Sequence, residues 1–148
     1  MAAGSAEAIQ QLVAEGPEGS KVIPLSVAGA FHTSYMSSAV GKLAEFVSSL
    51  SVDDPSKTLW SNQAGQQVDS GTEFLNLLVG QVANSVRWDL CMEAMLKAGV
   101  TAVIEVSPAG TLAGLAKRGM PGVEIVALKE PKDLETAREL INRTGDSK

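Results

Sequence analysis

The chain has 148 residues, of which 45% are hydrophobic and 20% are charged, and this balance excludes an intrinsically disordered protein. Its net charge of -5, with acidic and basic residues interspersed, argues against nonspecific nucleic-acid binding and against a polybasic membrane surface. A single cysteine, Cys91, excludes an internal disulfide framework. There is no apolar run of transmembrane length and no signal-peptide pattern, so we expect a cytoplasmic protein.

Periodicity, capping residues and turn residues predict helices and strands that alternate along most of the chain. Helices are predicted over residues 5–15, 33–50, 85–98, 111–118 and 132–142, with one more after a capping box at 70–73. Strands are predicted over residues 22–27, 58–60, 101–106 and 123–128. Strands separated by helices indicate an α/β fold with a mostly parallel sheet.

His32 is the only histidine in the chain, and it follows a predicted strand and precedes a predicted helix. Side chains at such junctions commonly face a cleft, where an imidazole is a candidate general base. The alternative, on position alone, is a histidine that only binds a local carbonyl. Cys91 is expected in the core rather than as a nucleophile, and one histidine with one cysteine cannot form a standard zinc site.

Three short motifs follow one another in order. They are VAGAFHT at 27–33, QVANSVRW at 81–88 and IEVSPAGTL at 104–112. Together they closely resemble the C-terminal half of the malonyl-CoA:acyl carrier protein transacylases, the acyltransferases of fatty-acid and polyketide synthesis. The resemblance covers almost the whole chain, from residue 2 to about residue 140.

The resemblance implies transfer of a malonyl group from malonyl-CoA, through a malonyl-serine, to the phosphopantetheine thiol of acyl carrier protein. His32 matches the family's general-base histidine. Gln81 matches the position whose backbone carbonyl holds the other ring nitrogen, and the end of a helix leaves such a carbonyl without an intrahelical partner. Apart from these two substrates, the resemblance implies no cofactor and no metal.

Phe31 carries the expectation about substrate. In related acyltransferases a phenylalanine just before the histidine accompanies malonyl units, and a smaller residue accompanies methylmalonyl units. The physical account is steric, because the ring fills the space that an α-methyl branch needs. Phe31 is therefore expected to favour malonyl, although it could also pack inward under the turn.

The family's nucleophile sequence, Gly-His-Ser-x-Gly, does not occur in this chain. No serine here has the strand–turn–helix setting of a nucleophile elbow. We expect the nucleophile to lie upstream of Met1, so that this chain supplies the histidine and is inactive in isolation. One alternative is a non-catalytic, truncated fragment that acts as an interaction domain, and another is a hydrolase or transferase that uses an unrecognised serine.

The resemblance also implies an architecture. Residues 1–28 are expected to be the end of a ferredoxin-like small subdomain, and residues 29–148 part of an α/β-hydrolase-like parallel sheet flanked by helices. Missing strands would expose sheet edges, so we expect either self-association or a companion chain that supplies the missing N-terminal half. By charge alone, the candidates for contact with the acidic carrier protein are Lys117, Arg118, Lys129 and Lys132.

Overall fold

The computed structural model describes residues 2–145. These residues form two compact units, one made of residues 2–63 and 67–86 and the other of residues 64–66 and 87–145. The subdomain boundary expected between residues 28 and 29 stays a prediction.

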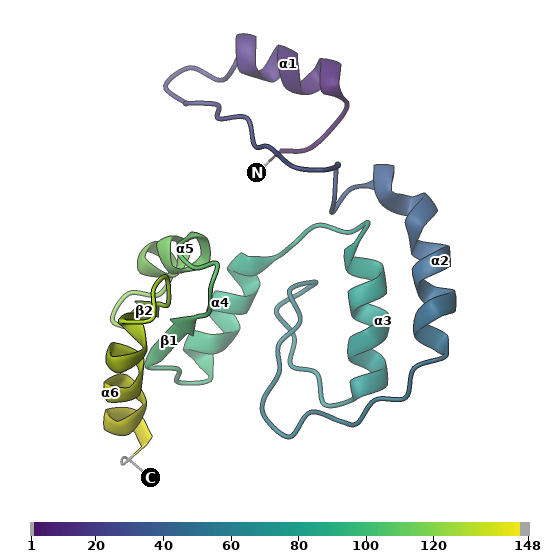
Figure 1. The fold of residues 1–148 in the computed structure, drawn as a ribbon. Helices are drawn as coiled ribbons and strands as arrows, with labels where there is room; N and C mark the ends of the chain where they lie inside the picture. Colours follow the sequence, from purple (N-terminus) through teal and green to yellow (C-terminus); the bar gives the residue numbers. More distant parts are fainter. Residues whose placement is uncertain (1, 146–148) are drawn as a thin grey trace. The chain divides into compact units, whose positions relative to one another are not determined.

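The first unit is helical. It contains α1 (Ala6–Ala14), the 3-10 turn η1 (Ser34–Met36), α2 (Ser37–Ser48) and α3 (Gly71–Gln81) (Figure 1). Ser5 caps α1, and Ser70 caps α3 by accepting a hydrogen bond from the Glu73 amide, as the capping box predicted. The helix predicted over 33–50 is a 3-10 turn followed by α2, and α2 and α3 lie side by side (Figure 1).

The two strands predicted in the first unit are wrong. Residues 22–27 form no strand, and residues 58–60 contribute only an isolated antiparallel bridge between Trp60 and Gln67. A strand needs a neighbour that completes its hydrogen bonds, and the described part of this unit offers none to residues 22–27. Ile23, Leu25 and Val27 consequently remain 64%, 58% and 68% exposed.

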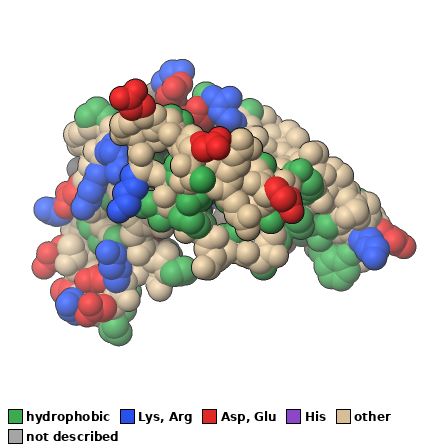
Figure 2. Space-filling model, turned by 90° about the horizontal axis from the view of Figure 1, so that it is seen from above, with side chains coloured by type: hydrophobic (Ala, Val, Ile, Leu, Met, Phe, Trp, Pro, Cys, Tyr) green, Lys and Arg blue, Asp and Glu red, His purple; other side chains and the backbone are tan. Residues whose placement is uncertain are grey.

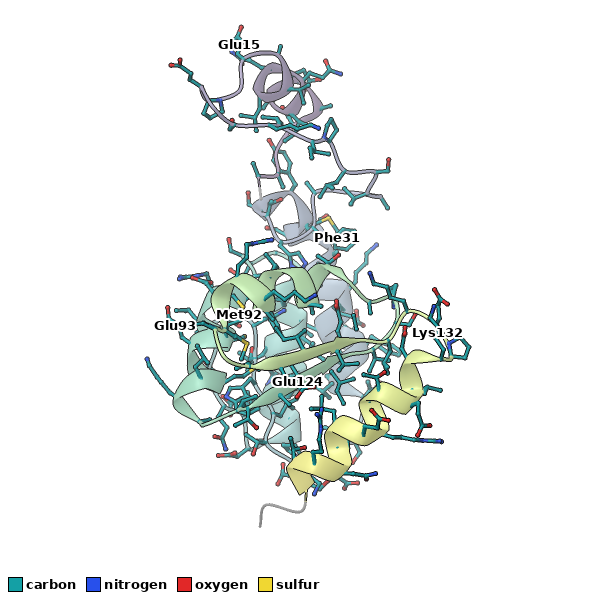
Figure 3. The ribbon with its side chains drawn as sticks, turned by 90° about the vertical axis from the view of Figure 1, so that its left-hand side faces the viewer. Glu15, Phe31, Met92, Glu93, Glu124 and Lys132 are labelled. Carbon is teal, nitrogen blue, oxygen red and sulfur yellow. The ribbon has the colours of Figure 1, made fainter. Side chains whose placement is uncertain are left out.

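The second unit is built around a parallel pair of strands. It contains α4 (Trp88–Lys97), β1 (Ala102–Glu105), α5 (Thr111–Gly119), β2 (Glu124–Ala127) and α6 (Asp133–Gly145). In the register of the pair, Ala102 lies opposite Glu124 and Glu105 lies opposite Ala127. Figure 3 shows α5 on one face of the strands and α6 on the other. The strand–helix–strand unit predicted from the sequence is therefore present, and the sheet is parallel as expected.

One hydrophobic cluster of the second unit lies between α6 and the strands. Its buried side chains are Val126, Ala137 and Leu140, with Ala102, Ile104 and Leu128 packed against them. On the other side, α4 packs on α5 at Gly119, where a Cβ atom would stand 2.7 Å from the Met92 methyl carbon (Figure 3). A larger residue at position 119 would require the flexible end of the Met92 side chain to move. No helix in residues 2–145 combines the length and apolar character needed to cross a bilayer.

Candidate functional site

His32 lies at the C-terminal end of α3. Its ring Nδ1 stands 2.7 Å from the backbone oxygen of Gln81, and its backbone N–H donates to the Val82 carbonyl at 2.9 Å. The two contacts join consecutive carbonyls of the helix end to one residue that is 49 positions earlier in the chain. His32 is exposed rather than sealed in the interior.

The chemistry of the acceptor fixes the tautomer of the neutral ring. A carbonyl oxygen only accepts, so Nδ1 must carry the hydrogen that joins it to Gln81. The other nitrogen, Nε2, is then unprotonated and carries a free lone pair. Within residues 2–145 it makes no hydrogen bond, so it is free to accept a proton.

Gln81 is the last residue of α3, which explains why its carbonyl is available. Its side chain is buried, with 6% exposed, and its Nε2 donates to the carbonyls of Asn84 at 2.8 Å and Ser85 at 3.1 Å. The Asn84 amide in turn donates to the Gly80 carbonyl at 2.7 Å. These bonds hold the residues after α3 in a turn, and α4 therefore begins at Trp88 rather than at Ser85 as predicted.

The loop before α2 is fixed by Thr33. Its hydroxyl donates to the Ala30 carbonyl at 2.6 Å and accepts from the Tyr35 amide at 3.3 Å. Phe31, which is labelled in Figure 3, is 48% exposed and lies beside Gly29. The ring is therefore not buried under the turn.

Glu105, in the third motif, has a role that sequence reasoning missed. Its carboxylate accepts the backbone N–H groups of Gly110, Leu112 and Ala113 at 2.7–2.9 Å, at the start of α5. Partial burial raises the pKa of this carboxyl, but the three N–H donors and the nearby Lys129 lower it, and the lowering prevails. The available signal was Gly110 at the N-cap, which has no side chain to cap the helix.

The second unit also contains ion pairs and a buried cysteine. Arg87 pairs with Asp89 at 2.6 Å, and Lys132 pairs with Glu130 at 3.0 Å. Cys91 is 1% exposed, and burial raises the pKa of its thiol, as a core residue requires. Among residues 2–145, no cluster of histidine, cysteine, aspartate and glutamate has the makings of a metal site.

Comparison with known proteins agrees with the motifs. Over 140 residues, or 95% of its length, the chain is 41% identical to the malonyl CoA-acyl carrier protein transacylase of Mycobacterium tuberculosis, of which it covers 46%. A crystal structure described as MCAT from the same organism superimposes on this chain with a TM-score of 0.83. The match covers 90% of this chain and 44% of the crystallised one.

The chain is homologous to the malonyl CoA-acyl carrier protein transacylases. The resemblance carried by the three motifs is thereby confirmed, and so is the α/β fold. The chain spans about half the length of the transacylases it matches. A further structure, 28% identical with a TM-score of 0.79, is described as a malonyl-transacylase in complex with a type II PKS acyl-carrier protein. No protein-family model matches the chain.

Proposed function

We propose that this chain is the histidine-bearing part of a cytoplasmic malonyl-CoA:acyl carrier protein transacylase. The observation that carries the proposal is the 2.7 Å contact between His32 Nδ1 and the Gln81 carbonyl. It orients the ring and leaves Nε2 as the base. A neutral carbonyl does this without the fixed negative charge that an aspartate contributes in other triads.

The reaction needs a nucleophilic serine hydroxyl, and this chain contains no Gly-His-Ser-x-Gly sequence that would provide one. In the first half-reaction, His32 Nε2 takes the proton of a serine hydroxyl while the oxygen attacks the thioester carbon of malonyl-CoA. The same proton then goes to the departing CoA sulfur, which leaves a malonyl-serine ester. In the second half-reaction, Nε2 takes the proton of the phosphopantetheine thiol, the sulfur attacks the ester, and the serine oxygen recovers the proton.

Exposed apolar side chains in the first unit support a companion polypeptide that brings this serine. Among its described residues only two apolar side chains are buried, Val68 and Val79. Eleven large apolar residues are exposed, at Val13, Ile23, Leu25, Val27, Phe31, Tyr35, Phe46, Leu50, Val52, Leu78 and Val86. Figure 2 shows hydrophobic side chains open to the surface among charged ones. An apolar surface on this scale is typical of a face that another polypeptide covers.

Mixing tests the proposal. The full chain is combined with a polypeptide that comprises the part of the Mycobacterium tuberculosis transacylase for which this chain has no counterpart. Malonyl transfer to phosphopantetheinylated carrier protein is then measured. We expect transfer only with both components present, and we expect His32→Ala to reduce the rate by about 10²–10⁴-fold, which is the usual contribution of a general acid–base.

Asn76→Ala is the matched control, because Asn76 is exposed on the same helix that presents Gln81. It should leave the rate unchanged. Equal rates for the native chain and His32→Ala would contradict the catalytic role. Complex formation with no transfer would favour the alternative, a non-catalytic interaction domain.

A further inference from the structure

We propose that the side-chain amide of Gln81 is a positioning group for His32, in addition to the backbone carbonyl that contacts the ring. The catalytic meaning of this inference rests on the proposed function. The structural part, control of the imidazole tautomer and orientation, does not depend on it.

The side-chain amides of Gln81 and Asn84 both donate to backbone carbonyls around the end of α3, and we call this set of bonds the Gln81–Asn84 clamp. Gln81 Nε2 donates to two carbonyls, those of Asn84 and Ser85, while Asn84 Nδ2 donates back to the Gly80 carbonyl. The clamp therefore fixes the peptide groups on both sides of the carbonyls that receive His32. If it loosens, the Gln81 and Val82 oxygens lose their fixed direction.

The orientation of the Gln81 amide follows from its surroundings. Turning the amide over would point Oε1 at two carbonyl oxygens, which cannot donate. In the orientation present, Oε1 is buried and has no hydrogen-bond partner among the described residues. An unpaired buried oxygen is unfavourable, and local costs of this kind are commonly found at functional sites.

His32 needs such support because its backbone is strained. Its φ is 65°, the only positive φ of a non-glycine residue in the described chain. Left-handed backbone at a histidine persists where the surrounding structure holds it in place. Here both holding contacts, at Nδ1 and at the backbone N–H, end on carbonyls that the clamp orients.

The sole histidine makes the test direct, because the full chain has a single imidazole signal set. Long-range ¹H–¹⁵N spectra of the neutral ring report which nitrogen carries the proton. The native chain should show the proton on Nδ1. Gln81→Glu is nearly isosteric but places an oxygen against the Asn84 and Ser85 carbonyls, so the ratio of Nδ1–H to Nε2–H should fall by at least about fivefold.

Gln10→Glu makes the same chemical change at an exposed position of α1 and should leave the ratio unaltered. A folded Gln81→Glu chain with the native ratio would overturn the proposal. If that variant does not fold, Asn84→Asp provides the test. Asn84 is exposed, and the introduced carboxylate would face the Gly80 carbonyl without a hydrogen to donate. An unchanged ratio in Asn84→Asp would likewise overturn it.

Transfer assays with the companion polypeptide separate this inference from the proposed function. With both correct, Gln81→Glu lowers kcat much more than it raises KM, because substrate contacts are untouched. A changed tautomer ratio together with full activity of His32→Ala would confirm the clamp and reject the catalytic role. The two ideas therefore fail by different measurements.

Discussion

At the scale of single residues, His32 combines a left-handed backbone with two hydrogen bonds to one helix end, one from its ring and one from its backbone N–H. The strain belongs to any residue with a Cβ atom at this position, whereas the ring contact belongs to histidine alone. Substitutions at position 32 can therefore separate the energetics of the backbone from the chemistry of the ring.

We expect His32→Gly to be more stable than His32→Ala by about 1 kcal/mol, since glycine adopts positive φ without the steric penalty that alanine pays. Neither variant keeps the imidazole, so the comparison isolates the backbone. Urea unfolding of both variants measures it. An alanine variant as stable as the glycine variant would show that φ is not constrained at this position.

Phe31 gives a prediction about substrate choice. Phe31→Ala should raise kcat/KM for methylmalonyl-CoA relative to malonyl-CoA by about 10–200-fold in the complemented enzyme, because one methyl group in a pocket is worth about 1–3 kcal/mol. Competition between the two thioesters measures the ratio. Tyr35→Ala removes another exposed aromatic ring from the same loop and should not change it.

At the scale of elements, α5 depends on an anion that comes from the preceding strand. Helix starts are usually capped by their own N-cap side chain, but here Glu105 at the end of β1 binds three amides of the α5 start. One carboxylate thereby ties β1 to α5. The third motif therefore has a structural role, whereas the contact between His32 and Gln81 joins the first two motifs.

Removing that charge should destabilise the second unit in a pH-dependent way. The pKa of Glu105 is lowered on folding, so its stabilising effect is complete above the unfolded pKa of about 4.3 and is lost as the pH falls through the lower folded value. Glu105→Gln should therefore be less stable than the native chain at pH 7, and the difference should shrink at pH below about 4. Thermal unfolding across this range measures the difference. Glu139→Gln, on the exposed side of α6, should show no such deficit.

At the scale of the whole molecule, the chain reproduces about half of a transacylase and keeps that part's fold. What the first unit lacks is cover for its apolar residues and a neighbour for residues 22–27. A companion polypeptide would provide both, because an added strand satisfies backbone amides and buries alternate side chains.

Hydrogen exchange tests this directly. The amides of residues 22, 23, 25, 26 and 27 donate no backbone hydrogen bond to any of residues 2–145 and should exchange fast in the chain alone. On addition of the companion polypeptide, their exchange should slow by at least about tenfold, or about 1.4 kcal/mol of local stability. Amides paired between β1 and β2 are protected beforehand and serve as the internal reference. Unchanged exchange at 22–27 in a formed complex would exclude this segment from the interface.

Local sequence signals were sufficient for the helices and for the parallel strand pair. Ser70 predicted the start of α3, and the apolar runs near 102–105 and 124–127 predicted strands that do pair with each other. The same kind of signal failed at 22–27 and 58–60. Alternating apolar residues predict a surface that suits a sheet, but pairing requires a second segment at the right distance.

The candidate site divides in the same way. The resemblance carried by the three ordered motifs was enough to nominate His32, Gln81 and Phe31, because it matches residue types position by position. The sequence could not reveal the positive φ of His32, the two carbonyls bound by the Gln81 amide or the three amides bound by Glu105. Those features arise only on folding: the loop before α2 meets the end of α3 in the first unit, and the end of β1 meets the start of α5 in the second. The sequence thus determined which residues are candidates for the chemistry. Only the tertiary structure determined how their side chains are oriented, since a hydrogen bond depends on the positions and directions of both partners.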